Sequence, residues 1–149
     1  MIIQIIALEL FHGPTLAFKD VGARFMSRCL GYFAKQSTAS SNEKISSTKN
    51  TITKDTTVLV ATSGDTGGAV ANGFLGVEGV NVIILYPKGK VSPIQELQLT
   101  TCGQNITALE VEGSFDDCQA IVKEAFMDGE LNAFYNLTSA NSINVARWL

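Results

Sequence analysis

The sequence predicts an α/β fold in which a parallel sheet carries helices on both faces. Short apolar segments, each long enough for one strand, alternate along the chain with segments of helical periodicity. Such alternation is typical of parallel strands joined by helical crossovers. The 149 residues suffice for one domain with a substantial core, so we expect a single domain over 1–149.

The chain begins with an apolar run, MIIQIIALELF, which predicts a buried strand. The run is too short to cross a bilayer. It carries Glu9 and has neither a basic leader nor a small-residue cleavage site, so it does not read as an anchor or a signal peptide.

The next segment, from Ala17 to about Lys35, predicts an amphipathic helix whose apolar face lies in the core. Its apolar residues recur mainly at intervals of three and four. They are Phe18, Val21, Phe25, Met26, Cys29, Leu30 and Phe33. From Gln36 to Thr57 the chain is rich in Ser, Thr, Asn and Lys and lacks periodicity, which predicts an inserted surface loop.

Strands and helices alternate through the rest of the chain. The predicted strands are Val58–Ala61, Val80–Tyr86 and Ile106–Val111, and the predicted helices lie near Thr66–Gly76, Ser92–Thr101 and Ser114–Phe126. The last of these helices opens with Ser114 and has Asp117 three positions on. This pair resembles a capping box with Asp in place of Glu or Gln, which we interpret as structural.

One lysine stands out, because FHGPTLAFKD places Lys19 behind a Gly-Pro turn and an aromatic residue at the start of the first helix. A lysine amine becomes nucleophilic at neutral pH when its charged form is disfavoured, as in a partly apolar site beside Phe18. Lysines are mostly exposed, so a solvated lysine in the first helical turn is the alternative.

A second segment, VLVATSGDTGGAVANGF, predicts a strand, a small-residue turn and a helix. Glycines let the backbone approach a ligand, and hydroxyl groups add donors beside a helix N-terminus, so a carboxylate fits there. The residues concerned are Ser63, Gly64, Thr66, Gly67 and Gly68. The alternative is a plain turn whose glycines serve packing. Neither standard phosphate-loop spacing is present, which argues against a nucleotide-binding module.

Four motifs in order, LELFHGPTLAFKD, ATSGDTGGAVA, ILYPKGKVSPIQELQLTT and SANSINVAR, resemble the threonine synthase family. These are pyridoxal-phosphate enzymes of the tryptophan-synthase-β structural group. The resemblance implies fold type II, mainly its smaller domain. The family's glycine-rich phosphate cup and the hydroxyl residue at the pyridine nitrogen lie downstream of these motifs. We therefore expect a partial catalytic domain, an internal piece of a longer enzyme.

The resemblance also implies the roles of particular residues. Lys19 would hold pyridoxal 5'-phosphate as a Schiff base, and Asp65 would face the cofactor ring. The substrate α-carboxylate would be bound by Ser63, Gly64, Thr66 and Gly67. The substrate phosphate would be bound by Asn141, Ser142, Asn144 and Arg147.

The implied reaction converts O-phosphohomoserine and water to threonine and phosphate. Two alternatives stay open. A related phospho-lyase would keep the lysine and the SGDTG turn but release a keto acid. A truncated domain without catalytic activity is the other alternative.

Charge and composition narrow the possible partners. The net charge is −3 with no basic run, so nothing points to nucleic acid or an anionic membrane surface. The cysteines, Cys29, Cys102 and Cys118, are scattered, and the lone His12 completes no zinc spacing with them. We expect reduced thiols, no metal, and a cytoplasmic enzyme with a small-molecule substrate.

Overall fold

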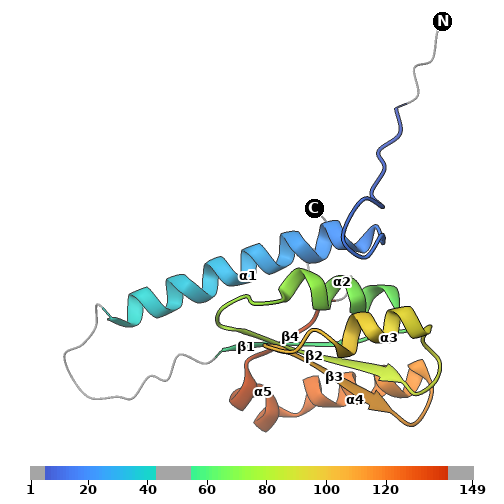
Figure 1. Ribbon diagram of the computed structural model, residues 1–149. Helices are drawn as coiled ribbons and strands as arrows, with labels where there is room; N and C mark the ends of the chain where they lie inside the picture. Colours follow the sequence, from blue (N-terminus) through green and yellow to red (C-terminus); the bar gives the residue numbers. More distant parts are fainter. Residues whose placement is uncertain (1–5, 43–54, 141–149) are drawn as a thin grey trace, which may run out of the picture.

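A parallel sheet lies between two layers of helices in the computed structural model, which describes residues 6–42 and 55–140 (Figure 1). Its strand order is β3-β2-β1-β4. The strands are β1 (Thr56–Ala61), β2 (Val80–Pro87), β3 (Ile106–Val111) and β4 (Leu137–Thr138). The helices are α1 (Lys19–Asn42), α2 (Asp65–Phe74), α3 (Pro93–Thr100), α4 (Phe115–Met127) and α5 (Gly129–Tyr135). The predicted fold class is confirmed.

The central strands are buried on both faces. β1 and β2 pair in parallel, with Val58 opposite Val82 and Leu59 opposite Ile83. Alternate residues point to opposite faces, so Val58 and Val82 join the core under α1, α2 and α3. Leu59 joins a second, smaller core against α4. Two-sided burial explains why these strands are continuous apolar runs rather than alternating ones.

On one face of the sheet, α1 packs along α2, and the two helices approach closely. A Cβ at Gly73 of α2 would lie 3.2 Å from the backbone carbonyl carbon of Ala23 in α1. Small residues at this crossing allow the two helices to lie this close together. Ala23 and Met26 are buried beside the crossing. This packing holds the first turn of α1 in place above the sheet.

The predicted capping box of α4 is confirmed. Ser114 is the N-cap residue, and its hydroxyl accepts a hydrogen bond from the Asp117 backbone N–H. The Asp117 carboxylate accepts from the Ser114 backbone N–H at 2.7 Å and from the Ser114 hydroxyl at 2.8 Å. These bonds hold the pKa of Asp117 below its usual value.

The first helix is longer than the sequence predicts, because α1 continues from Lys35 through Asn42. The added segment contains no Gly or Pro that would end a helix. At the other end of the predicted loop Gln36–Thr57, strand β1 already begins at Thr56. Residues 43–54 lie outside the described residues, so a surface loop there stays a prediction.

The predicted apolar face of α1 is only partly in the core. Met26 is buried and Cys29 and Leu30 are half-buried, as expected. In contrast, the large side chains of Phe18, Val21, Phe25 and Phe33 are exposed. The buried face instead contains small and polar residues, among them Asp20, Ala23 and Ser27. The reason is the close crossing with α2, which leaves no room for aromatic rings between the helices.

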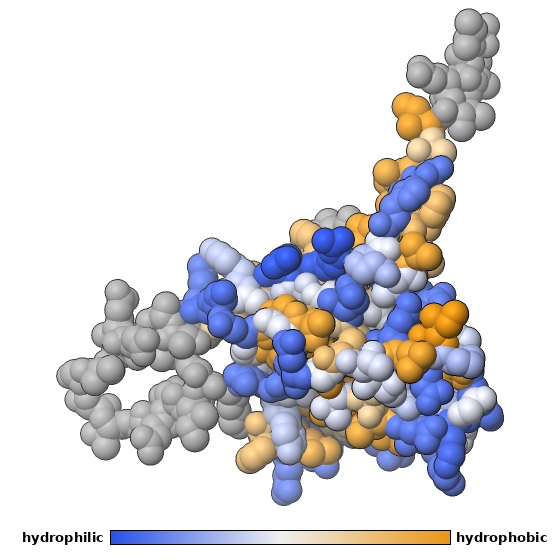
Figure 2. Space-filling model, in the orientation of Figure 1, coloured by the Kyte–Doolittle hydropathy of each residue, from blue (hydrophilic) through white to orange (hydrophobic). Residues whose placement is uncertain are grey.

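The predicted N-terminal strand is wrong over the residues that the structure describes. Residues 6–12 have no regular secondary structure, and Ile6 and Leu8 are 84% and 83% exposed. Figure 2 shows apolar side chains along this segment where it projects from the body of the molecule. A strand needs a partner backbone for its hydrogen bonds, and no described strand pairs with this segment. Residues 1–5 lie outside the described part of the chain.

Two short elements were not predicted. α5 begins after Asp128, whose carboxylate accepts from the backbone N–H groups of Glu130 and Leu131. It ends at Asn136, which adopts the left-handed conformation with φ 48°. β4 follows at once and pairs with β1. The Asp-Gly pair at 128–129 is the local signal for the cap, but a strand as short as β4 has no sequence signature of its own.

The orientation of α1 can be tested with two adjacent residues. We expect Met26→Ala to lower the free energy of unfolding by about 2–4 kcal/mol, because Met26 is fully buried. The matched variant Phe25→Ala should lower it by less than about 1 kcal/mol, because Phe25 is 43% exposed. Urea unfolding of both variants measures the difference. A larger loss of unfolding free energy for Phe25→Ala than for Met26→Ala would mean that the aromatic face of α1 lies in the core.

Candidate active site

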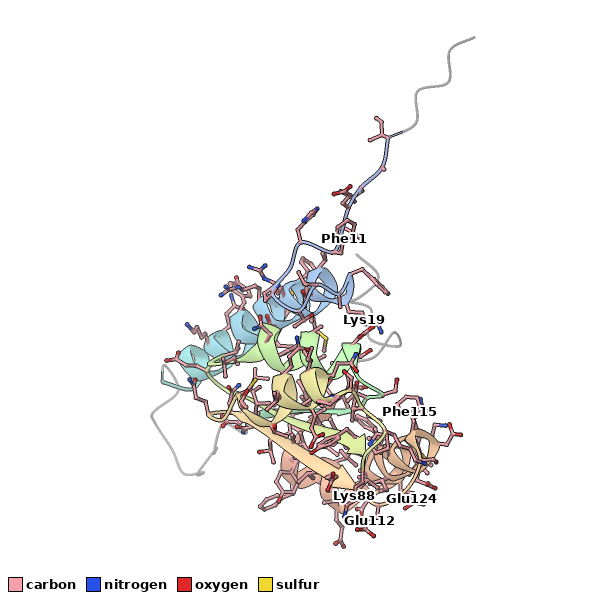
Figure 3. The ribbon with its side chains drawn as sticks, turned by 45° about the vertical axis from the view of Figure 1, so that its right-hand side comes forward. Phe11, Lys19, Lys88, Glu112, Phe115 and Glu124 are labelled. Atoms are coloured by element: carbon pink, nitrogen blue, oxygen red, sulfur yellow. The ribbon has the colours of Figure 1, made fainter. Side chains whose placement is uncertain are left out.

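Helix starts gather at the edge of the sheet where the parallel strands end. β1 ends at Ala61 and β2 at Pro87, and the chain turns from these ends into α2 and α3. The first turn of α1 lies at the same edge, and Figure 3 shows Lys19 projecting there toward the start of α2. Ligands of open α/β sheets commonly bind outside the carboxyl ends of the strands. The candidate site is therefore where the fold would place it.

The amine of Lys19 has an acidic and an aromatic neighbour. Its Nζ lies 3.9 Å from Oδ2 of Asp65, and the Lys19 side chain is 26% exposed. The same Nζ lies 5.6 Å from the centroid of the Phe18 ring. Both neighbours attract a positive charge. Phe18 thus lies beside the amine, as the sequence predicts, but it is 62% exposed and does not enclose the amine in an apolar site.

The turn before Lys19 is fixed by a buried carboxylate. Asp20 is 2% exposed and accepts hydrogen bonds from the backbone N–H of Thr15 at 2.9 Å and from its hydroxyl at 2.6 Å. A Cβ at Gly13 would collide with this carboxylate, so only glycine allows the turn to close over it. Because Asp20 follows Lys19 directly, these bonds fix the backbone that carries the lysine.

The turn between β1 and α2 is organised around one hydroxyl group. Thr62 Oγ1 accepts hydrogen bonds from the backbone N–H of Gly64 at 3.0 Å and of Gly67 at 2.8 Å. It donates in return to the Gly64 carbonyl at 3.1 Å. Gly64 has φ 144° and ψ −91°, a conformation open only to glycine. The turn thus exposes Ser63 and Asp65 at the end of β1.

Gln95, at the start of α3, is a site residue that the sequence did not reveal. Its Nε2 donates to Oδ1 of Asp65 at 2.6 Å. Its Oε1 accepts from Ser92, the N-cap residue of α3, at 3.3 Å from the backbone N–H and 3.0 Å from the hydroxyl. The Ser-Pro-Ile-Gln spacing is typical of a capping box, which the structure shows at the start of α3. No sequence signal indicates that the other end of Gln95 reaches a residue of α2.

The structure brings together part of the predicted set. Lys19 and Asp65 lie side by side, and the predicted carboxylate-binding residues form the turn next to Asp65. Those residues are Ser63, Gly64, Thr66 and Gly67. The predicted phosphate-binding residues Asn141, Ser142, Asn144 and Arg147 lie outside the described residues, so their role stays a prediction.

Three other side chains have raised pKa values, which favours their neutral forms. Burial raises the pKa of the Tyr86 phenol, and Glu110 and Glu96 raise it further. Burial also raises the pKa of the Cys102 and Cys118 thiols, and Asp117 adds to the rise at Cys118. None of these groups is therefore a nucleophile that competes with Lys19.

Metal clusters and membrane-spanning helices are both absent from residues 6–42 and 55–140. No group of three or more His, Cys, Asp or Glu side chains in these ranges is arranged to hold a metal ion. No helix in the same ranges has the length and apolar character needed to cross a membrane.

The sequence of this chain is similar to those of known enzymes. A family model described as pyridoxal-phosphate dependent enzyme matches residues 5–148. The chain is 53% identical over 141 residues to threonine synthase from Buchnera aphidicola and 51% identical over 142 residues to that from Escherichia coli. Each match covers 95% of this chain and 29% of the relative. The chain thus spans less than a third of the length of these relatives.

Solved structures agree with the sequence comparison. The crystal structure of threonine synthase from Escherichia coli superposes with a TM-score of 0.77 at 51% identity, covering 94% of this chain and 29% of that one. The pyridoxal-phosphate-bound threonine synthase from Brucella melitensis gives a TM-score of 0.80 at 43% identity, covering 94% and 27%. The parallel sheet and its helices therefore match part of the fold of pyridoxal-phosphate dependent enzymes.

The role of Thr62 in shaping the turn can be tested by substitution. Thr62→Val keeps the shape but removes the hydroxyl, leaving the N–H groups of Gly64 and Gly67 without this acceptor. We expect a loss of about 1–3 kcal/mol in unfolding free energy and faster amide exchange at these two glycines. Thr62→Ser is the matched control and should retain both bonds. Equal exchange rates in the Val and Ser variants would contradict this role.

Proposed function

This chain belongs to the family of pyridoxal-phosphate dependent enzymes, and we propose that it provides the cofactor-binding lysine, Lys19, of a threonine synthase. The observation that carries the proposal is the placement of Lys19 beside Asp65 at the carboxyl edge of the sheet. The high identity to threonine synthases supports the specific activity.

The residues at this edge fit the aldehyde end of pyridoxal phosphate. The Lys19 amine lies 3.9 Å from Asp65 of the SGDTG turn, and its side chain is partly exposed, so an aldehyde can reach it. The buried Asp20 fixes the backbone beside it, which limits the orientations that the lysine can adopt. The Asp65 carboxylate supplies a negative charge facing the same space.

When bound, pyridoxal phosphate supplies an electron sink for the negative charge that develops at the substrate α-carbon. The free amine of Lys19 would accept the α-proton of the substrate at Nζ. Asp65, 3.9 Å from Nζ, stabilises the ammonium that this transfer produces. Lys19 is thus both the attachment point and the base in this proposal.

The turn after β1 would bind the substrate by its α-carboxylate. Thr62 and Gly64 hold the turn in one conformation. The exposed Ser63 hydroxyl and the partly exposed Thr66 hydroxyl are donors at the start of α2, where the helix dipole favours an anion. The proposed substrate is O-phosphohomoserine, whose phosphate would be held by Asn141, Ser142, Asn144 and Arg147.

The proposal extends to organisation and location. Residues 1–149 would form one partial catalytic domain, with a surface loop in the segment between α1 and β1. The enzyme would act in the cytoplasm on a small molecule. A single domain is supported by the packing of α1 and β1 in one core, although the segment 43–55 separates them along the chain.

Cofactor attachment can be tested on this chain directly. After incubation with pyridoxal phosphate and reduction with borohydride, peptide mass spectrometry should find the phosphopyridoxyl group mainly on Lys19. Lys19→Arg keeps the positive charge but cannot form the adduct, so the labelled peptide should disappear. Lys35→Arg, at an exposed lysine of the same helix, is the matched control and should leave labelling unchanged. Labelling spread evenly over the lysines would contradict the proposal.

The reaction itself can be tested in a chimera. The matching segment of the Escherichia coli threonine synthase would be replaced by this chain, and products from O-phosphohomoserine measured. We expect threonine and phosphate in equal amounts, and a loss of at least about a thousandfold in kcat on Lys19→Ala, because the base is removed. A keto acid in place of threonine would instead support the phospho-lyase alternative. A folded chimera that binds the cofactor and forms neither product would contradict the proposed activity.

A further inference from the structure

The two ends of the Gln95 side chain have different partners. Its carbonyl end, Oε1, accepts from the backbone N–H and the hydroxyl of Ser92, and so completes the capping box of α3. Its amide nitrogen, Nε2, donates to Asp65 at 2.6 Å. Because Ser92 requires an acceptor, the capping box fixes which end of the amide faces Asp65.

Asp65 is held between two helices other than its own. One carboxylate oxygen, Oδ1, accepts from Gln95 in α3, and the other, Oδ2, faces Lys19 of α1 at 3.9 Å. The Asp65 side chain is itself 56% exposed, so nothing but these contacts restrains it from turning into solvent. The hydrogen bond from Gln95 therefore sets where the negative charge lies relative to the lysine.

The backbone beside this contact is built around the same amide. A Cβ at Gly64 would lie 2.5 Å from Oε1 of Gln95 and 2.7 Å from Nε2, so the amide packs directly on the glycine. Gly64 thus serves two purposes, the unusual backbone conformation and room for Gln95. Contact with the turn brings α3 into the site.

The chemistry of the contact explains why an amide is needed. Glu is as good as Gln at this position of a capping box, and it has nearly the same size. A carboxylate at position 95 would, however, place a second negative oxygen where Nε2 now donates to Asp65. Only a side chain that accepts at one end and donates at the other satisfies both Ser92 and Asp65.

We propose that Gln95 is a positioning residue for Lys19, acting through Asp65: it holds the carboxylate toward the amine and adds no second negative charge beside Asp65. The inference rests on the proposed function only in taking Lys19 as the reactive lysine. It assigns a part in the site to α3, whose sequence lies in the third motif but whose residues were given no role from the sequence.

The test measures the reactivity of Lys19 without any cofactor. Trace acetic anhydride acetylates only neutral amines, and peptide mass spectrometry gives the rate at Lys19 relative to Lys88. Lys88 is a suitable internal reference, because it lies away from the site (Figure 3). Its Nζ pairs with Oε1 of Glu112 at a distance of 2.7 Å. Gln95→Glu keeps the capping box but adds a negative charge, so the Lys19 to Lys88 ratio should fall about threefold.

For Gln95→Leu we expect the opposite result. This variant removes the donor and frees Asp65 to turn into solvent, so the Lys19 to Lys88 acetylation ratio should rise about threefold. A purely structural role for Gln95 would leave Gln95→Glu unchanged, because the cap is kept, and would raise the ratio only in Gln95→Leu. Opposite shifts in the two variants support the proposal, and any other pattern overturns it.

A double variant tests whether the contact between positions 65 and 95 itself is responsible. When Asp65→Asn is combined with Gln95→Glu, the amide introduced at position 65 can donate to the carboxylate introduced at position 95. Donor and acceptor thus exchange places and one negative charge remains, so the ratio should return to within about twofold of the original. If a single variant unfolds, this double variant decides, and a ratio that stays at the value of Asp65→Asn alone overturns the proposal. Failure of pyridoxal phosphate to label Lys19 would count against the proposed function and leave this result intact.

Discussion

The parallel pairing of β1 with β2 is the constraint on which the rest of the structure depends. Parallel strands end at the same edge of a sheet, so the chain must leave β1 and β2 side by side. Burial on both faces holds the register, because a shift by one residue would exchange the side chains of the two cores. The starts of α2 and α3 are adjacent for this reason. The hydrogen bond from Gln95 of α3 to Asp65 of α2 follows from that adjacency.

The position of α1 depends on the same sheet through α2. Its close crossing at Ala23 and Gly73 requires small side chains, which turns the large aromatic residues of α1 outward. The first turn of α1 is thereby held over the N-terminus of α2, and Lys19 comes within 3.9 Å of Asp65. Packing between two helices thus contributes to this distance, beside the local bonds of Asp20 that fix the backbone of Lys19.

Local patterns in the sequence were enough for the fold class, the strands β1, β2 and β3, and the cap of α4. The apolar runs of β1, β2 and β3 and the Ser114 cap are short-range features, and each was predicted close to its observed position. The burial of α1 was mispredicted because periodicity identifies apolar residues but does not reveal how closely the neighbouring helix approaches. The apolar N-terminal run was mispredicted because a strand also needs a partner, and pairing is a long-range property.

The candidate site was predictable to a similar extent. Lys19 and the SGDTG turn were recognised through motifs, each contained within one stretch of chain. Gln95 was not, because its role depends on a contact with Asp65 across 30 positions in sequence. Its local pattern is fully explained by the capping box, which leaves no unexplained signal in the sequence. A side chain that bonds to two partners, as Gln95 does to Ser92 and Asp65, can be identified only when the positions of both partners are known.

The contacts around Lys19 differ in how easily they can be lost, and this difference fits the role proposed for Lys19. The Asp20 carboxylate is buried and accepts two bonds from Thr15, so breaking them would leave a charged group unsatisfied in the interior. The pair between Lys19 and Asp65 is half-exposed and 3.9 Å long, and such pairs contribute at most about 1 kcal/mol. The amine can therefore leave Asp65 to attack an aldehyde at little cost, while the backbone that carries it stays fixed.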